Sequence, residues 1–317
     1  MDSRRQPRIG VALSGGGLRG LAHLGVLQVL EEAQVPVDML AGTSMGGIVA
    51  GLYGAGVPLE EIVAFTSQTG LIDLASPDRQ WRGLFCQNKT SRLLAGVLGG
   101  DDVTFEDLKM PVTVVAANLE TGDQVLLNQG PLIPALLATA AFPILFSPVR
   151  HRERWLVDGG VLNNLPVDVV RSMGANRVLA VSVPPTVQLS LESDEQPTGI
   201  SMRGLRRFGS HTLDWKQPFL IAEASSGMTV QAVNRRRLAA FPPDLLLEIQ
   251  LPNVGLFFAE GTNAAIIEAG RQVALDHRGQ LLSLARPLPP VWWQRLAAAW
   301  RRLRRVLAAL KEPQPPI

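Results

Sequence analysis

A chain of 317 residues, 46% of them hydrophobic, can bury a large core, and its single cysteine, Cys86, excludes an intramolecular disulfide. The formal net charge is +2, but residues 291–317 hold six basic side chains against one acidic side chain, so this tail carries +5 and the rest of the chain −3. The excess of positive charge therefore lies in the tail, and the charge of the body gives no reason to expect a nucleic-acid partner.

No group of cysteines and histidines has the spacing of metal ligands, and we expect neither a metal nor an organic cofactor. The first five residues, Met-Asp-Ser-Arg-Arg, lead into an apolar run at 9–13 that is too short for the core of a signal peptide. We therefore expect a cytoplasmic protein.

The N-terminal stretch predicts a strand, a helix and a second strand. Residues 8–14 form a short apolar run that ends in three glycines, and 18–34 carries apolar residues at helical spacing until Pro36. A second apolar run at 37–43 leads to Ser44. This order is a βαβ unit, which predicts a parallel sheet with right-handed crossovers.

The remainder of the body alternates between strands and helices. The expected strands are 111–118, 124–127, 155–157, 177–183 and 244–251. The expected helices are 48–53, 58–69, 132–141, 167–173, 221–240 and 259–285. Two further segments are irregular or polar, and we expect 73–101 to cover the site and 184–216 to form a flap.

The stretch 124–149 contains no charged residue and is long enough to span a bilayer. Four prolines divide it into a strand, a short helix and a turn: Pro131, Pro134, Pro143 and Pro148. We therefore expect a buried core segment rather than a membrane span.

The motif Gly42-Thr43-Ser44-Met45-Gly46-Gly47 lies between the second strand and the next helix. Glycines two positions before and after Ser44 allow a sharp strand-to-helix turn with the serine at its apex. The helix would direct its free N–H groups and its positive dipole end towards an oxyanion. Ser44 is the candidate nucleophile, although G-x-S-x-G is also typical of a turn without chemistry.

A glycine loop follows the first strand, with the sequence Gly15-Gly16-Gly17-Leu18-Arg19-Gly20. As a dinucleotide fingerprint it would need an acidic residue at the end of the second strand, but Asp38 lies at the beginning of that strand. As an oxyanion loop, the same glycines would present N–H groups beside Ser44. The second interpretation fits better, and Arg19 would either support an oxyanion or phosphate or be a solvated residue.

A serine hydroxyl becomes nucleophilic when a base takes its proton. Asp158 is the candidate base because it ends a short strand and precedes Gly159 and Gly160, although Asp-Gly is also a common turn signal. The histidines lie in the first helix, a basic loop, the flap and a late helix, at positions 23, 151, 211 and 277. None has an identifiable acidic partner, so no Ser-His-Asp triad can be built.

Three blocks in this order resemble the patatin-like phospholipase family: G-G-G-L-R-G-L-A-H-L-G-V-L, G-T-S-M-G-G and D-G-G-V-L-N-N-L-P-V-D, with A-T-A-A-F-P before the third. The resemblance covers roughly residues 8–184 and implies a Ser–Asp dyad, in which Ser44 attacks an ester carbonyl and Asp158 is the base. It also implies that N–H groups of the glycine loop and of Met45 hold the oxyanion. The oxyanion residues would be Gly15, Gly16, Gly17 and Met45, and the other motif glycines Gly20, Gly42, Gly46, Gly159 and Gly160.

An unperturbed aspartate has a pKa of about 3.9 and is a weak base at neutral pH. We therefore expect burial beside Ser44 to raise the pKa of Asp158.

The tail predicts a helix at 291–310, after a proline-rich break at 287–290. Trp293, Trp300 and several leucines recur along one side, and most of the arginines lie off it. Such a helix lies in a lipid interface or packs its apolar side on the body or on a second subunit. We expect peripheral membrane contact through 291–311 and leave a homo-oligomer open.

Together these features predict one α/β domain over residues 1–286, a three-layer α/β/α sandwich with a mainly parallel sheet, followed by a linker and basic helix at 287–317. The expected activity is hydrolysis of fatty-acyl esters of phospholipids or lysophospholipids, a lipid substrate reached from the inner face of a membrane. The alternatives are a small-ester or thioester hydrolase and a non-catalytic adaptor that keeps the fold. The position of Asp38, at the beginning of the second strand, argues against a nucleotide-binding oxidoreductase.

Overall fold

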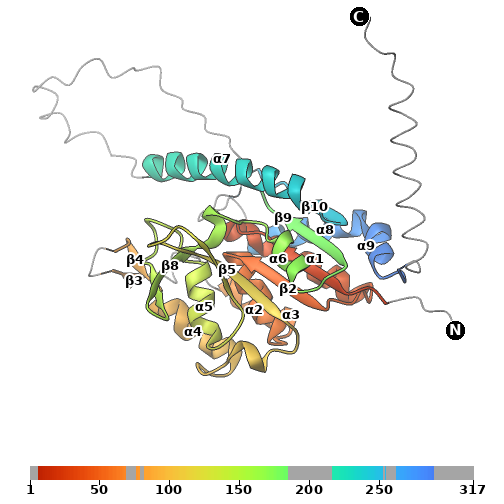
Figure 1. Cartoon of the computed structure of the whole chain (residues 1–317), viewed down its shortest axis with the longest axis horizontal. Coiled ribbons are helices and arrows are strands. Elements are labelled where there is room, and N and C mark those ends of the chain that lie inside the picture. The colour runs from red at the N-terminus through yellow and green to blue at the C-terminus, as the bar shows by residue number, and fades with distance from the viewer. Residues whose placement is uncertain are drawn as a thin grey trace, which may run out of the picture.

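The computed structural model describes residues 6–68, 76–78, 82–184, 216–252, 254 and 262–288. In this part of the chain a central sheet lies between two layers of helices (Figure 1). The strands follow the order β10-β9-β1-β2-β5-β8-β7, with β6 paired to β5. The predicted three-layer α/β/α sandwich is therefore confirmed.

The strands of the main sheet are β1 (Ile9–Leu13), β2 (Met39–Thr43), β5 (Val112–Asn118), β6 (Gln124–Leu127), β7 (Val149–His151), β8 (Arg154–Asp158), β9 (Arg177–Ser182) and β10 (Leu245–Glu248). A separate small sheet pairs β3 (Ser76–Pro77) with β4 (Phe85–Cys86). The α-helices are α1 (Ala22–Glu32), α2 (Met45–Gly54), α3 (Leu59–Gln68), α4 (Asn88–Leu98), α5 (Leu132–Thr139), α6 (Val167–Ser172), α7 (Lys216–Ala240), α8 (Asn263–Asp276) and α9 (Arg278–Leu284). Short 3-10 helices are η1 (Gly17–Leu21), η2 (Phe105–Asp107) and η3 (Gly159–Val161).

The predicted βαβ unit is present as β1, α1 and β2. The two strands pair in parallel, with Leu13 beside Gly42 at their C-terminal ends. Alternate residues of β1 enter different cores: Val11 and Leu13 belong to the larger core with α1, α2 and α5, whereas Ala12 belongs to the smaller core beside α6. A strand buried on both faces reads as a continuous apolar run, which is why its sequence predicted it.

Strand β5 pairs with three other strands. β2 pairs in parallel with residues 112–115, β8 pairs antiparallel with residues 116–118, and β6 pairs with residues 114–117. Because β6 overlaps both other strands, it occupies one edge of β5 while β2 and β8 share the opposite edge. The C-terminal ends of β2 and β8 therefore meet beside the middle of β5.

The helices α1 and α8 pack closely on the larger core. A side chain at Gly25 of α1 would collide with the backbone of α8 at Ile267 and Arg271, and one at Gly270 of α8 would collide with the Ala22 carbonyl. Arg271 also forms an ion pair with Glu32 at 2.6 Å. The C-terminal third of the chain therefore covers the first helix.

Helix α4 lies within 73–101, which we expected to be irregular. Its sequence, Asn88–Leu98, includes Asn88, Thr90, Ser91 and Gly96, which are weak helix formers. The helix exists because it packs inward, with Leu94 buried, and it ends at Gly99 with a φ of 79°.

The β7–β8 hairpin was not predicted. Its two turn residues, Arg152 and Glu153, have φ values of 46° and 65°. Two-residue hairpin turns of this kind usually contain asparagine and glycine, so Arg152-Glu153 is not recognisable as a turn signal. The expected helix at 259–285 is also wrong in part, because the described residues form α8 and α9, with His277 between them.

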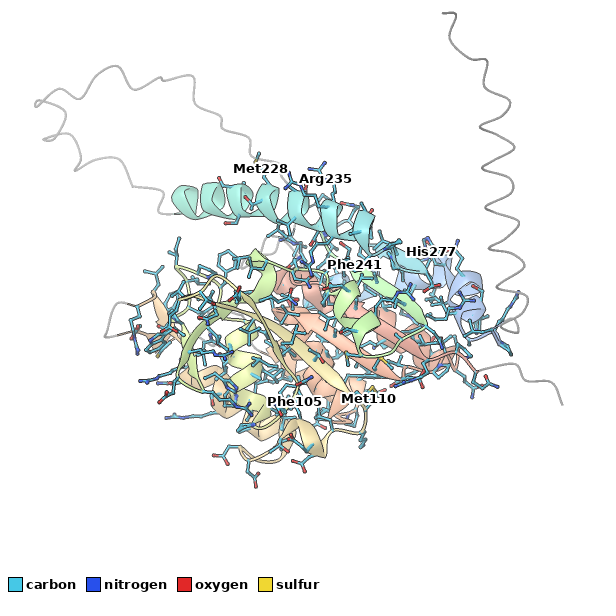
Figure 2. All side chains as sticks on the ribbon, in the orientation of Figure 1. Phe105, Met110, Met228, Arg235, Phe241 and His277 are labelled. Carbon is cyan, nitrogen blue, oxygen red and sulfur yellow. The ribbon has the colours of Figure 1, made fainter. Side chains whose placement is uncertain are left out.

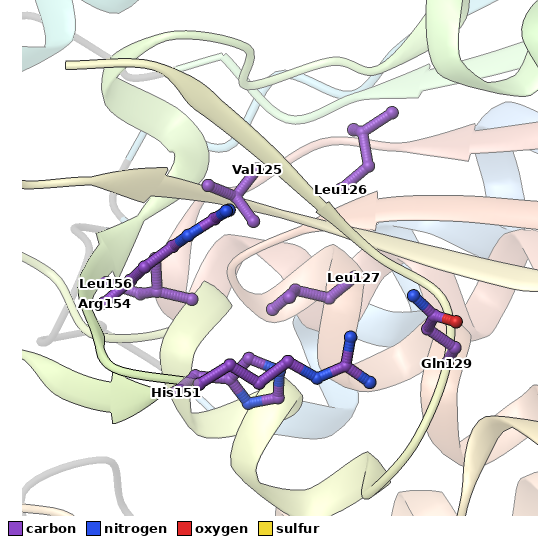
Figure 3. A pocket seen from close by; sticks show the side chains of 8 residues that line it. Val125, Leu126, Leu127, Gln129, His151, Arg154 and Leu156 are labelled. Carbon is purple, nitrogen blue, oxygen red and sulfur yellow. The ribbon is translucent and has the colours of Figure 1, made fainter. Parts of the chain in front are cut away.

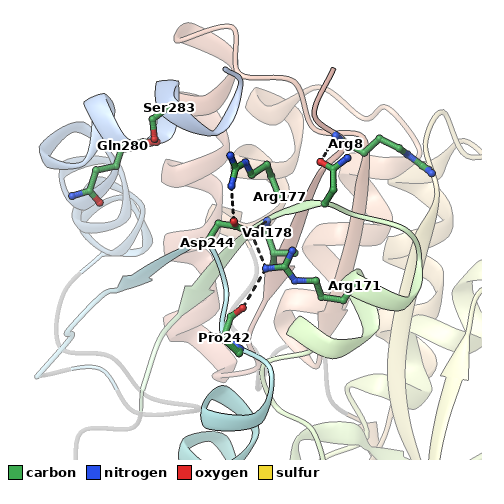
Figure 4. A network of polar contacts seen from close by, with 9 residues as sticks. Arg8, Arg171, Arg177, Val178, Pro242, Asp244, Gln280 and Ser283 are labelled. Atoms are coloured by element: carbon green, nitrogen blue, oxygen red, sulfur yellow. Dashed lines mark hydrogen bonds and ion pairs between the residues drawn. The ribbon is translucent and has the colours of Figure 1, made fainter. Parts of the chain in front are cut away.

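Helix α7 extends across the top of the molecule in Figure 1, and its residues Met228 and Arg235 point away from the sheet (Figure 2). After α7, Asp244 joins the chain to the sheet, because it accepts hydrogen bonds from Arg171 and Arg177 at 2.8 and 2.9 Å (Figure 4). These contacts fix the position of β10 beside β9.

Three predictions concern residues outside the described part of the chain. They are most of the flap at 184–216, the Pro-rich linker from 289 onwards and the basic helix at 291–311. Among the described residues, none of the helices combines the length and the apolar character that a membrane span requires.

Candidate active site

Ser44 stands at the apex of a sharp turn between β2 and α2. Its φ of 55° and ψ of −127° are rare for a residue with a side chain, and such backbone strain costs about 1–3 kcal/mol. A side chain at Gly42 would meet the Gly46 carbonyl, and one at Gly46 would meet the carbonyls of Leu13 and Ser14. The turn therefore needs glycine at both positions, as the motif predicted.

Buried hydrogen bonds hold this turn in place. The Ser44 N–H donates to the Thr139 hydroxyl at 2.9 Å, and the same hydroxyl donates to the Val115 carbonyl at 2.5 Å. The Thr43 hydroxyl donates to the Asn163 carbonyl at 2.8 Å. Helix α5, strand β5 and the loop after β8 thus all support the serine turn.

Asp158 lies at the end of β8 and is 3% exposed. Its carboxylate accepts a hydrogen bond from the Gly160 N–H at 2.7 Å. Burial raises the pKa of Asp158 to about 6, while the nearby Ser44 hydroxyl and the Gly160 N–H act in the opposite direction. The carboxyl group therefore lies near the serine hydroxyl and is a stronger base than an exposed aspartate.

The glycine loop lies beside Ser44, but its residues differ in what they can donate. The Gly15 N–H donates to the Asn164 carbonyl at 3.0 Å, and the Asn164 amide returns a hydrogen bond to the Gly15 carbonyl at 3.3 Å. The prediction that Gly15 donates to an oxyanion is therefore wrong. The N–H groups of Gly16, Gly17 and Met45 have no acceptor among the described residues and stay candidates.

Arg19 is 2% exposed, and its guanidinium donates to the Val254 carbonyl at 3.1 Å. The expectation of a solvated residue is therefore wrong. Its neighbour Gly20 faces the Met45 side chain, which a Cβ atom would overlap. Both residues pack the glycine loop against its surroundings.

The described histidines make no hydrogen bond with Ser44 or Asp158. His23 is fully buried, its Nε2 lies 2.8 Å from the Ser14 carbonyl, and burial lowers its pKa to about 4. Burial and the nearby Arg152 lower the pKa of His151, which lies on β7. His277, which follows α8, bonds to the Val273 carbonyl of that helix, and His211 lies outside the described residues.

Three residues that support the site were not predicted: Thr139, Asn163 and Asn164. Thr139 lies in the A-T-A-A-F-P block and both asparagines lie in the D-G-G-V-L-N-N block, so the motifs contained them without revealing their contacts. Asn163 also donates to Gln124 and Asp168 at 3.1 and 3.0 Å. Asp168 in turn forms an ion pair with Arg237 of α7 at 2.7 Å.

Two further observations concern the dinucleotide alternative and the side chains that could hold a metal ion. Asp38 accepts a hydrogen bond from the Ile9 N–H at 2.6 Å, at the start of β1, so it lies far from the edge where a ribose would bind. The described residues contain no group of histidine, cysteine or carboxylate side chains arranged to hold a metal ion.

A basic hollow of about 300 Å³ lies between β6 and the β7–β8 hairpin (Figure 3). Its lining includes His151, Arg152 and Arg154 together with the apolar side chains of Val125 and Leu156. Neither Ser44 nor Asp158 lines it, so this hollow is separate from the serine turn.

Comparison with known proteins gives a match to a family model described as patatin-like phospholipase over residues 11–171. An uncharacterized NTE family protein of Mycobacterium tuberculosis is 30% identical over 273 residues, covering 84% of this chain and 46% of that protein. The lysophospholipase NTE1 of Candida glabrata is 32% identical over 181 residues, covering 55% of this chain and 10% of the yeast protein. The chain thus spans about half the length of the mycobacterial relatives it matches.

Among solved structures, VipD from Legionella pneumophila matches with a TM-score of 0.51 and 15% sequence identity, covering 89% of this chain and 67% of VipD. At that identity the likeness concerns the fold. The residues matched by the family model contain the glycine loop, the Ser44 turn and the loop after Asp158. This chain belongs to the patatin-like phospholipase family.

Proposed function

We propose that this protein is a serine hydrolase of lipid acyl esters, with Ser44 as nucleophile and Asp158 as base. The observation that carries the proposal is the position of the strained Ser44 turn beside a buried carboxyl group, Asp158, whose pKa is raised to about 6. A base is most effective when its pKa lies near the working pH. Asp158 thus meets the requirement for activating a serine without a histidine.

In the first half of the reaction, the Asp158 carboxylate takes the hydroxyl proton while Ser44 Oγ attacks the ester carbonyl carbon. The resulting tetrahedral oxyanion lies within reach of N–H groups from Gly16, Gly17 and Met45 at the start of α2. These donors are fixed before the reaction, so they stabilise the developing charge without reorganisation. The alcohol part of the ester then leaves with the proton held by Asp158.

In the second half, water replaces the alcohol. Asp158 takes a proton from the water molecule as it attacks the acyl-Ser44 carbonyl, and the same oxyanion donors hold the second tetrahedral intermediate. Collapse of this intermediate breaks the bond to Ser44 Oγ. The serine recovers its proton from Asp158, and the free fatty acid leaves.

The substrate class we propose is phospholipids or lysophospholipids. Membership of the patatin-like phospholipase family supports this choice, and so does the name of the yeast relative, a lysophospholipase. The relatives are about twice as long as this chain or longer, so their full activities are not assigned to it. The substrate class is proposed only for the site around Ser44.

Mass spectrometry of products from a mixed lipid extract tests the proposal, with the native protein compared with Ser44→Ala. We expect free fatty acids and lysolipids or glycerophosphodiesters that depend on Ser44. Labelling of Ser44 by a fluorophosphonate probe reports its reactivity independently of substrate. A folded protein with an unreactive serine would contradict the proposal and favour the adaptor, and turnover of only short or thioester substrates would favour the small-ester hydrolase.

A further inference from the structure

The β7–β8 hairpin has two faces with different surroundings. Arg150 pairs with Trp155, and His151 pairs with Arg154. Paired residues lie on the same face of a sheet and successive residues on opposite faces. His151 and Arg154 line the basic hollow of Figure 3, so Arg150 and Trp155 must form the other face of the hairpin.

On that other face, arginines gather around an indole ring. The guanidinium of Arg82 lies 5.0 Å from the centre of the Trp155 ring, and that of Arg150 lies 5.9 Å from it. Both arginines are exposed, and neither forms an ion pair with another residue that the structure describes. Stacking on tryptophan orients their charges but leaves them able to bind an anion.

Two exposed apolar residues belong to the segments beside Arg82. Leu84 follows Arg82 by two residues, and its N–H donates to the Ile144 carbonyl at 3.0 Å, so Leu84 and Ile144 are neighbours. Their side chains are 36% and 70% exposed. Ile144 also has a φ of 73°, which is a strained conformation for a β-branched residue. The fold therefore holds an apolar side chain in water on a backbone that disfavours it.

The loop that carries Ile144 begins beside the candidate active site. The Asp158 N–H donates to the Ala141 carbonyl at 2.9 Å, and Ile144 follows three residues later in the same loop. Strand β8, which carries Trp155, ends at Asp158. The exposed side chains therefore lie on segments that lead to the proposed base.

We propose that Arg82, Leu84, Ile144, Arg150 and Trp155, here called the Trp155 face, dock on an anionic lipid bilayer. Guanidinium groups pair with phosphate, indole rings favour the boundary between water and lipid, and aliphatic side chains enter the acyl region. The choice of a bilayer rests on the proposed lipid hydrolase, since docking here would bring the Ser44 turn to its substrate. An acidic protein would match the arginines, but an exposed isoleucine beside them fits lipid better.

Vesicle sedimentation tests the proposal, using the full chain with Ser44→Ala so that no lipid is hydrolysed. The vesicles contain phosphatidylcholine with or without phosphatidylglycerol, at 0.15 M salt. We expect Arg82→Gln/Arg150→Gln to lower partition into anionic vesicles about tenfold or more. The matched pair Arg152→Gln/Arg154→Gln removes the same charge from the other face and should change partition less than about threefold. Equal losses for the two pairs would overturn the proposal, because only net charge would then matter.

Ile144→Asn separates docking from folding. Asparagine tolerates a positive φ, so the melting temperature should stay equal or rise, while partition should fall about fivefold as the apolar contact is lost. Vesicle binding that is unaffected by Ile144→Asn and by the Arg82/Arg150 pair would overturn the proposal and leave this face for a protein partner.

A second assay distinguishes this proposal from the proposed activity. In the chain with Ser44 intact, hydrolysis of a monomeric, water-soluble ester should be unchanged by all of these substitutions. If vesicle binding behaves as expected but no ester is hydrolysed, the docking surface stands and the proposed activity fails.

Discussion

Thr43 and Asp158 end two strands that run in opposite directions along one edge of β5, and they pair with Val115 and Ala116, which are consecutive residues. The residue after Thr43 is Ser44, so the β5 backbone sets the separation between serine and carboxylate. Two side chains 114 positions apart in the sequence therefore meet because a single strand aligns both of their strands.

Asp158→Asn should lower kcat about a thousandfold. Asparagine keeps the shape of the side chain but cannot take the Ser44 proton, and general bases typically contribute 10²- to 10⁴-fold. The measurement is turnover of a chromogenic ester together with the rate of fluorophosphonate labelling, with circular dichroism to check the fold. Turnover within threefold of the native rate in a folded variant would mean that another group is the base.

The pH dependence of kcat/KM should follow the ionisation of Asp158. Because its pKa is raised to about 6 and the base must be ionised, activity should fall about tenfold per pH unit below 6 and level off above 7. Ester hydrolysis from pH 4.5 to 8 gives the profile, and tryptophan fluorescence confirms that the protein stays folded. A profile that is flat down to pH 4.5 would contradict the raised pKa.

Asp158→Asn should also stabilise the fold at high pH. The pKa of Asp158 is higher in the folded state than in the unfolded state, so its contribution to stability is full below pH 4 and is lost as the pH rises through 6. At pH 8 the native protein buries a charge that asparagine lacks. We expect the variant to gain about 1–3 kcal/mol in the free energy of unfolding at pH 8.

Urea unfolding at pH 8 and at pH 4 measures this gain. It should be much smaller at pH 4, where the Asp158 carboxyl is almost fully protonated in the folded state and about half ionised in the unfolded state. A variant that is less stable than the native protein at pH 8, or equally stabilised at both pH values, would show that burial of the Asp158 charge does not oppose folding.

Thr139→Val should weaken both the fold and the site. Valine keeps the volume but leaves the Ser44 N–H and the Val115 carbonyl without their partner, and each such loss costs about 1–3 kcal/mol. We expect at least a 2 kcal/mol loss of stability and a clear fall in kcat. The control is Thr139→Ser, which retains the hydroxyl and should retain most of the activity. If Thr139→Ser and Thr139→Val lowered stability and kcat equally, the Thr139 hydroxyl would not be the group that supports the site.

Gly46→Ala should prevent the serine turn from forming. An added methyl group would overlap the carbonyls of Leu13 and Ser14, which belong to the backbone and cannot rotate away. We expect loss of soluble, active protein. The matched control is Gly96→Ala in α4, where a Cβ atom meets no neighbour within 4 Å and alanine should add up to about 1 kcal/mol. An active, stable Gly46→Ala protein would contradict the close packing of β1 and α2.

Much of this fold could be predicted because β1, β2, β5 and β9 are buried on both faces and read as apolar runs between glycines, prolines and amphipathic helices. The β7–β8 hairpin could not, because Arg152 and Glu153 adopt a positive φ without the asparagine or glycine that usually marks such a turn. Helix α4 was missed because its weak helix formers are stabilised by contacts with the rest of the fold.

The candidate site was predicted at the level of side-chain chemistry and missed at the level of backbone hydrogen bonds. Ser44 and Asp158 are marked by the glycines around them, and the structure brings the two side chains together. Whether a glycine N–H is free depends on a partner distant in sequence, and for Gly15 that partner is the Asn164 carbonyl. No local pattern reveals such a pairing.

The close packing of α8 on α1 limits how far this protein can be shortened. A fragment ending at residue 171, where the family match stops, would keep Ser44 and Asp158 but lose β9 and α8. Strand β1 would then become an unprotected edge, and the apolar surface around Gly25 would face water, which favours aggregation. The smallest unit that folds must therefore include residues from the final third of the chain that lie well beyond the catalytic motifs.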